Sequence, residues 1–193
     1  LLCSIMSISQ LRGMLRASQT ISDRYAQNIS KLGEIAEDFQ SLHRVIYEHC
    51  LTEDKAGRED LSTEASSLRS DIQASNIEYE EMMGKGSETE KFTQYESDYE
   101  EYLTNFEQAI RLSNKDRKED AQKLANGTLS ELGTEISEQI AGMIKDNKSG
   151  MEKAIASQKR TYNYSIFLVV ILLIASVVVD IFAIIISRNY ISI

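Results

Sequence analysis

The sequence predicts an all-α protein: an up-down-up-down antiparallel four-helix bundle with long first and fourth helices, the fourth continuous with a C-terminal transmembrane helix. The chain of 193 residues contains no proline, so few positions interrupt a helix. Its apolar residues alternate at spacings of three and four over long distances, as they do where helices pack along a continuous seam. One segment near the C-terminus is apolar apart from a single charge.

A polar turn separates the first two predicted helices. The seam of the first helix runs from Leu11 to His49, and we expect Gly57 to close that helix in the left-handed conformation. The second seam runs from Leu61 to Met82. The glycines of the segment 84–86 are expected to end the second helix in the same way.

Aromatic residues dominate the third helix, which is predicted to begin with a capping box at residues 87–90. The positions of its seam are Phe92, Tyr95, Tyr99, Tyr102, Phe106, Ala109 and Ser113. After a turn at 114–116, Asp116 is expected to cap the fourth helix. Because no helix breaker follows, one helix is predicted from Asp116 to Ser187, on the order of 100 Å long at about 1.5 Å per residue.

The segment 166–186 is predicted to cross a membrane. Its only charged residue is Asp180, and a run of about 20 apolar residues spans a bilayer core. Tyr162, Tyr164 and Tyr190 flank it, as aromatic residues do at membrane interfaces. A carboxylate inside a bilayer is costly, so Asp180 is a candidate functional residue.

These assignments divide the chain into four segments. Residues 1–8 are expected to be the end of a first membrane helix rather than a signal peptide, because no small-residue cleavage pattern follows them. Residues 9–161 form the bundle, residues 162–187 the second membrane helix and residues 188–193 the start of a following segment. The lipid bilayer is therefore an expected partner, although the basic residues on the two sides of the second membrane helix do not decide its orientation.

The unequal helix lengths predict a homodimer. The first and fourth helices extend beyond the second and third, so the shorter pair covers only part of the longer pair. Seam residues beyond the shorter pair, including Leu11, Met14 and Ile155, would be exposed in a single chain. A second copy of the chain would cover them.

Local sequence adds a family resemblance to this topology. The segments 8–12, 32–39 and 42–47 resemble the first helix of the four-helix-bundle sensor domain of bacterial methyl-accepting chemotaxis proteins. The closing segment 186–193 is similar to the run into a HAMP linker. The resemblance implies an extracytoplasmic bundle on the bacterial cytoplasmic membrane, which binds a small solute or a solute-loaded periplasmic binding protein and signals to cytoplasmic proteins through the fourth helix.

Two alternatives to a chemoreceptor remain open at this stage. The same input module precedes histidine kinases and diguanylate cyclases, so the output domain is not decided. A tail-anchored membrane-fusion protein of the syntaxin type is an alternative from another class. The apolar residues 1–8 and the charge of Asp180 in the anchor argue against it.

Two arginines are the first candidates for a solute site. Arg44 lies off the seam of the first helix, and Arg69 is predicted in the same layer on the second helix. A guanidinium group matches the bidentate geometry of a carboxylate ligand. In the family that this chain resembles, the members that bind amino acids use arginines in this way. The alternative is a surface arginine paired with a nearby acidic residue.

Tyr99 and Tyr102 are further candidates, because the aromatic row of the third helix could form a cage for a ring or a cation. The alternative is that these rings belong to the core. Residues 76–107 hold ten acidic residues against Lys85 and Lys91. This face would receive a basic partner or divalent cations, or is a solvated acidic surface.

The sequence predicts no enzyme, no cofactor and no nucleic-acid partner. No nucleophile–base pair or phosphate-binding loop is recognisable, and the net charge of −9 disfavours phosphate binding. No metal site is expected, because His43, His49 and Cys50 lack metal-ligand spacing. The sequence leaves open whether Cys50 meets its counterpart in a dimer.

Overall fold

The computed structural model describes residues 12–13, 15–16 and 18–191. The chain divides into two compact units, and each is described by itself. One is the bundle, Ser22–Met151. The other contains the described residues up to Ile21 and those from Glu152 onward. The predicted end of a first membrane helix at residues 1–8 lies outside the described residues, as do Leu11 and Met14.

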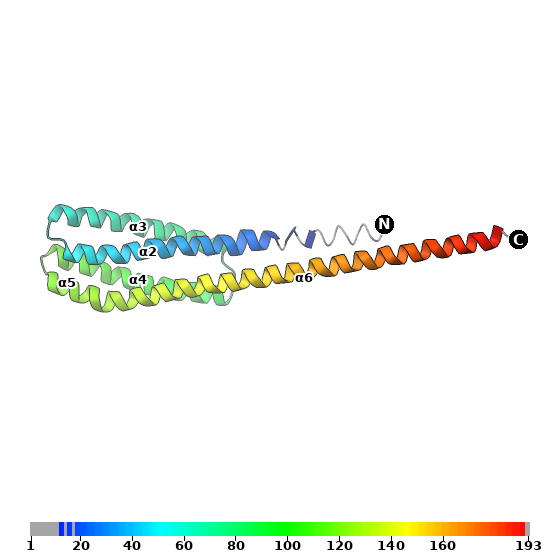
Figure 1. Cartoon of the computed structure of the whole chain (residues 1–193). Helices are drawn as coiled ribbons and strands as arrows, with labels where there is room; N and C mark the ends of the chain where they lie inside the picture. Colours follow the sequence, from blue (N-terminus) through cyan, green and yellow to red (C-terminus); the bar gives the residue numbers. More distant parts are fainter. Residues whose placement is uncertain (1–11, 14, 17, 192–193) are drawn as a thin grey trace. The chain divides into compact units, whose positions relative to one another are not determined.

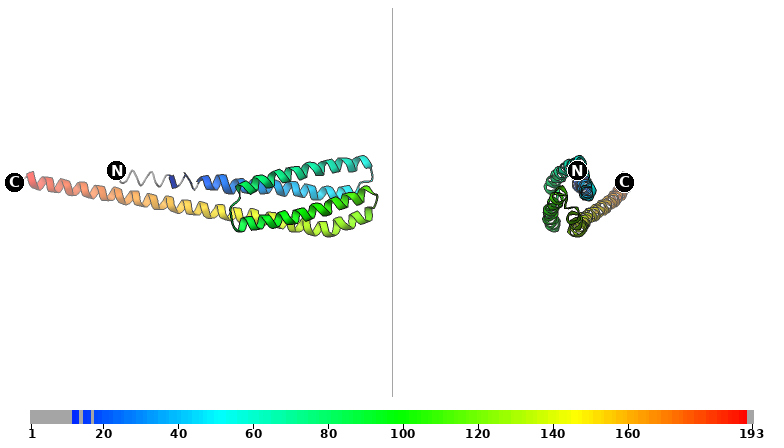
Figure 2. Two further views of the ribbon diagram at one scale, coloured as in Figure 1. Left: turned by 180° about the vertical axis from the view of Figure 1, so that it is seen from behind. Right: turned by 90° about the vertical axis from the view of Figure 1, so that its left-hand side faces the viewer.

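The helical segments of the bundle unit lie side by side (Figures 1 and 2). A π-helical segment, η1 (Thr20–Ala26), leads into the first of them. The helical elements that follow are α2 (Gln27–Leu51), α3 (Lys55–Met82), α4 (Ser87–Asn114), α5 (Lys118–Leu124), the π-helical segment η2 (Ala125–Leu129) and α6 (Ser130–Ile191). The bundle contains α6 only as far as Met151. The described residues contain no strand, and the all-α prediction with four helices is confirmed.

The apolar seams form the core of the bundle. Every predicted seam position of α4 is buried. Ile72 and Tyr79 of α3 are completely inaccessible to solvent, as are Leu32 and Ile35 of α2. Burial of such large side chains stabilises the bundle by about 1.5–3 kcal/mol each before the entropy of folding is counted.

Cys50 belongs to this core, with an exposed fraction of 1%. Burial raises the pKa of its thiol to about 11. Because a buried, protonated thiol is a poor nucleophile, Cys50 is not placed to form a disulfide with a second chain.

The helix ends differ from the sequence-based expectations. The chain leaves α2 at Thr52 in an extended conformation, and Gly57 lies in the first turn of α3, where its N–H donates to the Asp54 carboxylate at 3.0 Å. The predicted capping box is wrong, because α4 begins after Gly86 without a side-chain cap. Gly86 has a φ of 92°, which glycine adopts without strain.

The start of the fourth helix also differs. Asp116 was expected as its cap, but it has a φ of 58° and lies in the turn before Arg117. The segment from Lys118 to Ser187 is helical throughout, with η2 inserted as one wide turn. The hydroxyl of Tyr47 donates to the carbonyl of Ala125 at 3.1 Å, so part of the altered hydrogen bonding of this turn is satisfied from α2.

The first helix contains a similar irregularity. The spacing predicts an uninterrupted seam, whereas η1 is π-helical. A π turn inserts one residue and changes the register of the buried face. Of the predicted seam positions on either side of this π-helical segment, Ser18 is exposed and Asn28 is buried.

In the second unit, α6 contains the apolar segment that the sequence predicts to cross a membrane. Its side chains are exposed, including Phe167, Leu173 and Phe182, each at least 60% exposed. Among the described residues it is the one helix long and apolar enough to cross a membrane. A fully exposed apolar surface of this length is what a lipid bilayer covers.

Candidate functional site

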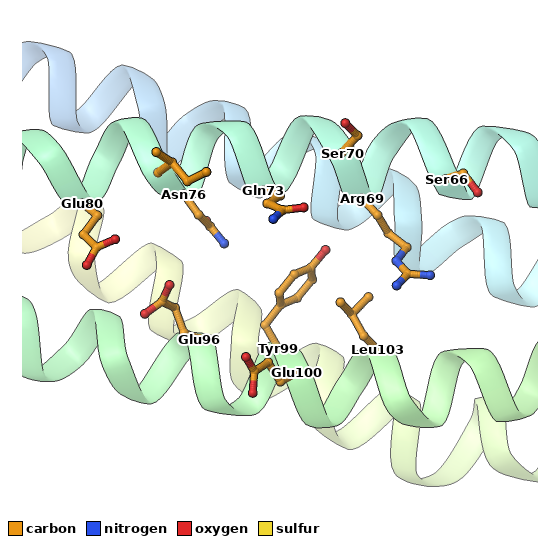
Figure 3. A pocket seen from close by; sticks show the side chains of 11 residues that line it. Ser66, Arg69, Ser70, Gln73, Asn76, Glu80, Glu96, Tyr99, Glu100 and Leu103 are labelled. Atoms are coloured by element: carbon orange, nitrogen blue, oxygen red, sulfur yellow. The ribbon is translucent and has the colours of Figure 1, made fainter.

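A candidate site is a cavity of about 540 Å³ between α3 and α4 (Figure 3). Small-molecule sites commonly have volumes of about 300–1,000 Å³. Side chains that recur at helical spacing on the facing sides of the two helices line it. They are Ser66, Arg69, Ser70, Gln73, Asn76, Ile77 and Glu80 of α3, and Glu96, Tyr99, Glu100 and Leu103 of α4.

Arg69 lies toward one end of this cavity (Figure 3). Its guanidinium donates to the carboxylate of Glu107 at 3.1 Å, which links α3 to α4. Arg69 also lines a second cavity of about 260 Å³, which Glu107 and Arg111 share. The Arg69–Glu107 ion pair therefore lies where the two cavities meet. We call the two cavities together the α3–α4 groove.

Tyr99 is the most unusual side chain of the cavity. It is only 6% exposed, and its ring stacks with that of Tyr95 at a centroid separation of 6.0 Å. Its hydroxyl oxygen is buried and has no hydrogen-bond partner. The ring comes from α4 and directs the hydroxyl toward α3 (Figure 3). A buried hydroxyl without a partner is costly in an apo protein, and a bound ligand can supply the missing partner.

Three carboxylates border the opposite end and the α4 side of the cavity. Glu80 belongs to α3, and Glu96 and Glu100 belong to α4 (Figure 3). Burial raises the pKa of Glu96, and the neighbouring charges of Glu80 and Glu100 raise it further. The exposed Glu80 and Glu100 therefore both repel the half-buried carboxylate of Glu96.

The other two sequence-predicted residues lie elsewhere. Arg44 is exposed and paired at 2.8 Å with both Glu48 and Glu64, as in the surface-pair alternative. Tyr102 is fully buried, and its hydroxyl hydrogen-bonds with Nδ1 of His43 at 3.0 Å. Neither residue lines the α3–α4 groove. The structure thus brings Arg69 and Tyr99 together and leaves Arg44 and Tyr102 apart from them.

Asp180 lies in the exposed apolar part of α6 and carries no contact that assigns it a role. It stays a candidate only because a carboxylate inside a bilayer is energetically costly. No group of three or more histidine, cysteine or acidic side chains in the described residues could hold a metal ion. His49 instead hydrogen-bonds through Nδ1 to the hydroxyl of Ser113 at 3.0 Å.

A hydrogen-bond network that was not predicted lies at the other end of α4. Its centre is the carboxylate of Glu88, whose side chain is 17% exposed. We call this set the Glu88 network. Its donors are Asn28, Tyr79 and Asn147 to Oε1, at 3.1, 2.9 and 2.9 Å, and the Gly84 N–H and Arg24 to Oε2, at 2.8 and 3.3 Å.

The donors determine the charge state of this carboxylate. Burial alone would raise the pKa of Glu88, but the hydrogen bonds from Asn147, Gly84, Tyr79 and Arg24 together hold it below its ordinary value. A sequence signal was available, since Asn28 is a polar residue at a seam position. Such a residue requires a buried partner.

A family model described as a four-helix-bundle sensory module for signal transduction matches residues 1–162. No curated protein matches the chain. The matched range includes the α3–α4 groove and the Glu88 network.

The Glu88 network leads to a pH-dependent prediction for Glu88→Gln. Because the folded-state pKa of Glu88 is lowered, its contribution to stability is present above the ordinary carboxyl pKa of about 4.3 and is lost as the pH falls through the folded value. At pH 7 the variant should lose about 1–3 kcal/mol of unfolding free energy relative to the parent chain. The difference should shrink below about pH 4.

Thermal unfolding of the full chain in detergent, followed by circular dichroism between pH 3 and 7, measures this difference. Glu90→Gln is the matched control, because Glu90 is an exposed carboxylate in the same turn of α4. A loss of stability that is equal at all pH values, or equal in the control, would contradict the assignment.

The two tyrosines lead to opposite predictions on removal of a hydroxyl. Tyr102→Phe removes the hydrogen bond to His43 and should cost about 0.5–1.5 kcal/mol. Tyr99→Phe removes a hydroxyl without a partner and should leave the unfolding free energy within about 0.5 kcal/mol of the parent value, or raise it. Urea unfolding of the full chain measures both, and equal losses would show that the Tyr99 hydroxyl has a partner in the free protein.

Proposed function

Because this chain belongs to the family of four-helix-bundle sensory modules for signal transduction, we propose that it is the sensor and membrane segment of a bacterial chemoreceptor. In this proposal the bundle lies outside the cytoplasmic membrane and detects a small solute. The membrane-crossing part of α6 carries the signal to cytoplasmic proteins. The family membership favours this function over a membrane-fusion protein, and the proposal assigns no catalytic step to the chain.

The observation that carries the proposal is the α3–α4 groove with the unpartnered hydroxyl of Tyr99. The volume suits a small solute, and polar groups converge on it from two helices. A ligand there contacts α3 and α4 at once, so it can favour one spacing of the two helices over another. Such differential binding is what shifts a two-state equilibrium.

Contacts between α4 and α6 support a route for the signal. Lys91 of α4 is paired with Asp146 of α6, and Gln139 of α6 donates to Asp98 of α4. Asp98 is next to Tyr99 in sequence. A displacement of α4 by a ligand would therefore be felt by the helix that contains the apolar segment. Coupling free energies of this kind are typically about 1–3 kcal/mol.

Exposed apolar residues outside the bundle unit support the proposed homodimer. Leu15 is 57% exposed and Ile155 is 46% exposed. A second copy of the chain would cover such residues. A periplasmic binding protein remains the alternative carrier of the solute, and the input segment of a histidine kinase or a diguanylate cyclase remains the alternative output class.

A solute screen on the full chain in detergent tests direct sensing. At least one compound among amino acids, organic acids, amines and nucleobases should raise the unfolding temperature. A ligand at about 100 times its Kd should stabilise the folded state by about 2.7 kcal/mol. Ser70→Trp, which fills the groove, should abolish the effect.

Ser67→Trp is the control for that variant, because Ser67 is an exposed neighbour that does not line the cavity. A screen in which no compound changes the unfolding temperature would contradict direct sensing. A stabilisation that survives Ser70→Trp would place the solute elsewhere on the chain.

The proposed location of the bundle is tested by cysteine labelling in intact cells. Glu101 is exposed on α4, so Glu101→Cys should react with a membrane-impermeant maleimide before the cells are permeabilised. The parent chain is the control for its native cysteines, of which Cys50 is buried. Reaction only after permeabilisation would place the bundle in the cytoplasm and contradict the proposal.

A further inference from the structure

The charges that line the larger cavity of the groove do not balance. Its one cation, Arg69, is already paired with Glu107, a residue outside that cavity. The carboxylates of Glu80, Glu96 and Glu100 have no ion-pair partner among the residues that the structure describes. The cavity therefore holds uncompensated negative charge from both of its helices.

The three carboxylates lie close enough together for two of them to change the pKa of the third. Burial, followed by the charges of Glu80 and Glu100, raises the pKa of Glu96. Glu80 approaches from α3 and Glu96 from α4, so their repulsion acts across the groove (Figure 3). A positive charge between them would relieve that repulsion, whereas an anion would increase it.

The Tyr99 hydroxyl gives a second and independent indication of a ligand. It is buried, it lines the same cavity, and its oxygen accepts no hydrogen bond in the free chain. A phenolic oxygen can accept an N–H donor. A primary ammonium group has three such donors, enough to reach the hydroxyl and two carboxylates at once.

The size of the cavity distinguishes an organic cation from a metal ion. No set of three metal-ligating side chains in the described residues could hold an ion. A space of about 540 Å³ is that of a small organic molecule. The hydroxyl and carboxylates are spread along the two helices, as suits a ligand with a carbon skeleton.

We propose that the α3–α4 groove binds a small organic amine in its protonated form, with primary ammonium groups held by Glu80, Glu96, Glu100 and the hydroxyl of Tyr99. This inference rests on the proposed function, since it names the ligand class of the same groove. The Arg69–Glu107 pair then limits the length of the ligand by occupying one end of the cavity.

Binding of an amine would draw α3 and α4 together. The carboxylates that repel one another in the free chain would share a cation, so the closer spacing of the helices becomes the more stable one. The ligand would thereby change the position of α4, which is bonded to α6 through Asp98 and Lys91. The charge of the groove supplies both the recognition and the difference between the two states.

Isothermal titration of the full chain in nonionic detergent tests the ligand class with three four-carbon probes. They are 1,4-diaminobutane, butane-1,4-diol and succinate, which share a skeleton and differ in charge. We expect the diamine to bind at least tenfold more tightly than the diol, and succinate to show no binding. Tyr99→Phe and Glu96→Gln should each weaken diamine binding about tenfold, because each removes one acceptor.

Glu101→Gln is the matched control for Glu100→Gln. The two residues are adjacent on α4 and lose the same charge, but only Glu100 lines the cavity. We expect Glu100→Gln to weaken binding of the diamine and Glu101→Gln to leave it within twofold. Equal effects would reduce the interaction to general attraction by an acidic surface and overturn the proposal.

The remaining outcomes separate the ligand class from the proposed function. Binding of succinate or of the diol in preference to the diamine would overturn the amine and leave solute sensing in place. The same holds if only an anionic or neutral compound of the wider screen stabilises the chain and Ser70→Trp abolishes its effect. Failure of every compound in that screen would contradict both the amine and direct sensing.

Discussion

The carboxylate of Glu88 fixes one end of the bundle, because a single acceptor group receives donors from every part of the chain that meets there. These are η1, α2, α3, α6 and the turn between α3 and α4. In a partly desolvated site each of these bonds is strengthened, and each donor would be costly to leave unsatisfied. Relative sliding of the helices would break several bonds at once. The Glu88 network therefore opposes sliding of α4 past α6, so a displacement of α4 in the groove is carried to α6.

The α3–α4 groove is the contrasting part of the bundle. The side-chain hydrogen bonds from Tyr95 to Asn76 and from Arg69 to Glu107 cross it. The second is exposed to solvent and of small energetic value. Unpaired carboxylates and a buried hydroxyl without a partner occupy the space between them. One end of the bundle is held by many hydrogen bonds, whereas polar groups in the groove lack partners. A ligand can therefore change the spacing of α3 and α4 without unfolding the bundle.

Much of the fold follows from the sequence, because burial at seam positions is a property of each helix alone. The aromatic seam of α4 is an example. Polar residues at seam positions indicate buried hydrogen bonds, but their spacing does not identify the partners. His49 pairs with Ser113 inside the core, and Asn28 pairs with Asn147. The helix ends were less predictable: Gly57 and the segment 87–90 carry suitable residues, but the path of each turn depends on how the two flanking helices pack.

The site was predictable only in part for a related reason. Residue chemistry singled out Arg69 and Tyr99, but equally Arg44 and Tyr102, since a sequence does not state which faces of two helices oppose each other. Once the pairing of α3 and α4 is known, the role of a residue can be inferred from the side chains that face it across the groove. Glu80 and Glu96 then change from members of an acidic segment into two like charges that share a cavity. Solvated carboxylates are screened by water and salt, whereas Glu96 is half-buried, and the charges of Glu80 and Glu100 still raise its pKa. The ligand class is therefore argued from the three carboxylates that line the cavity, and not from the net charge of residues 76–107.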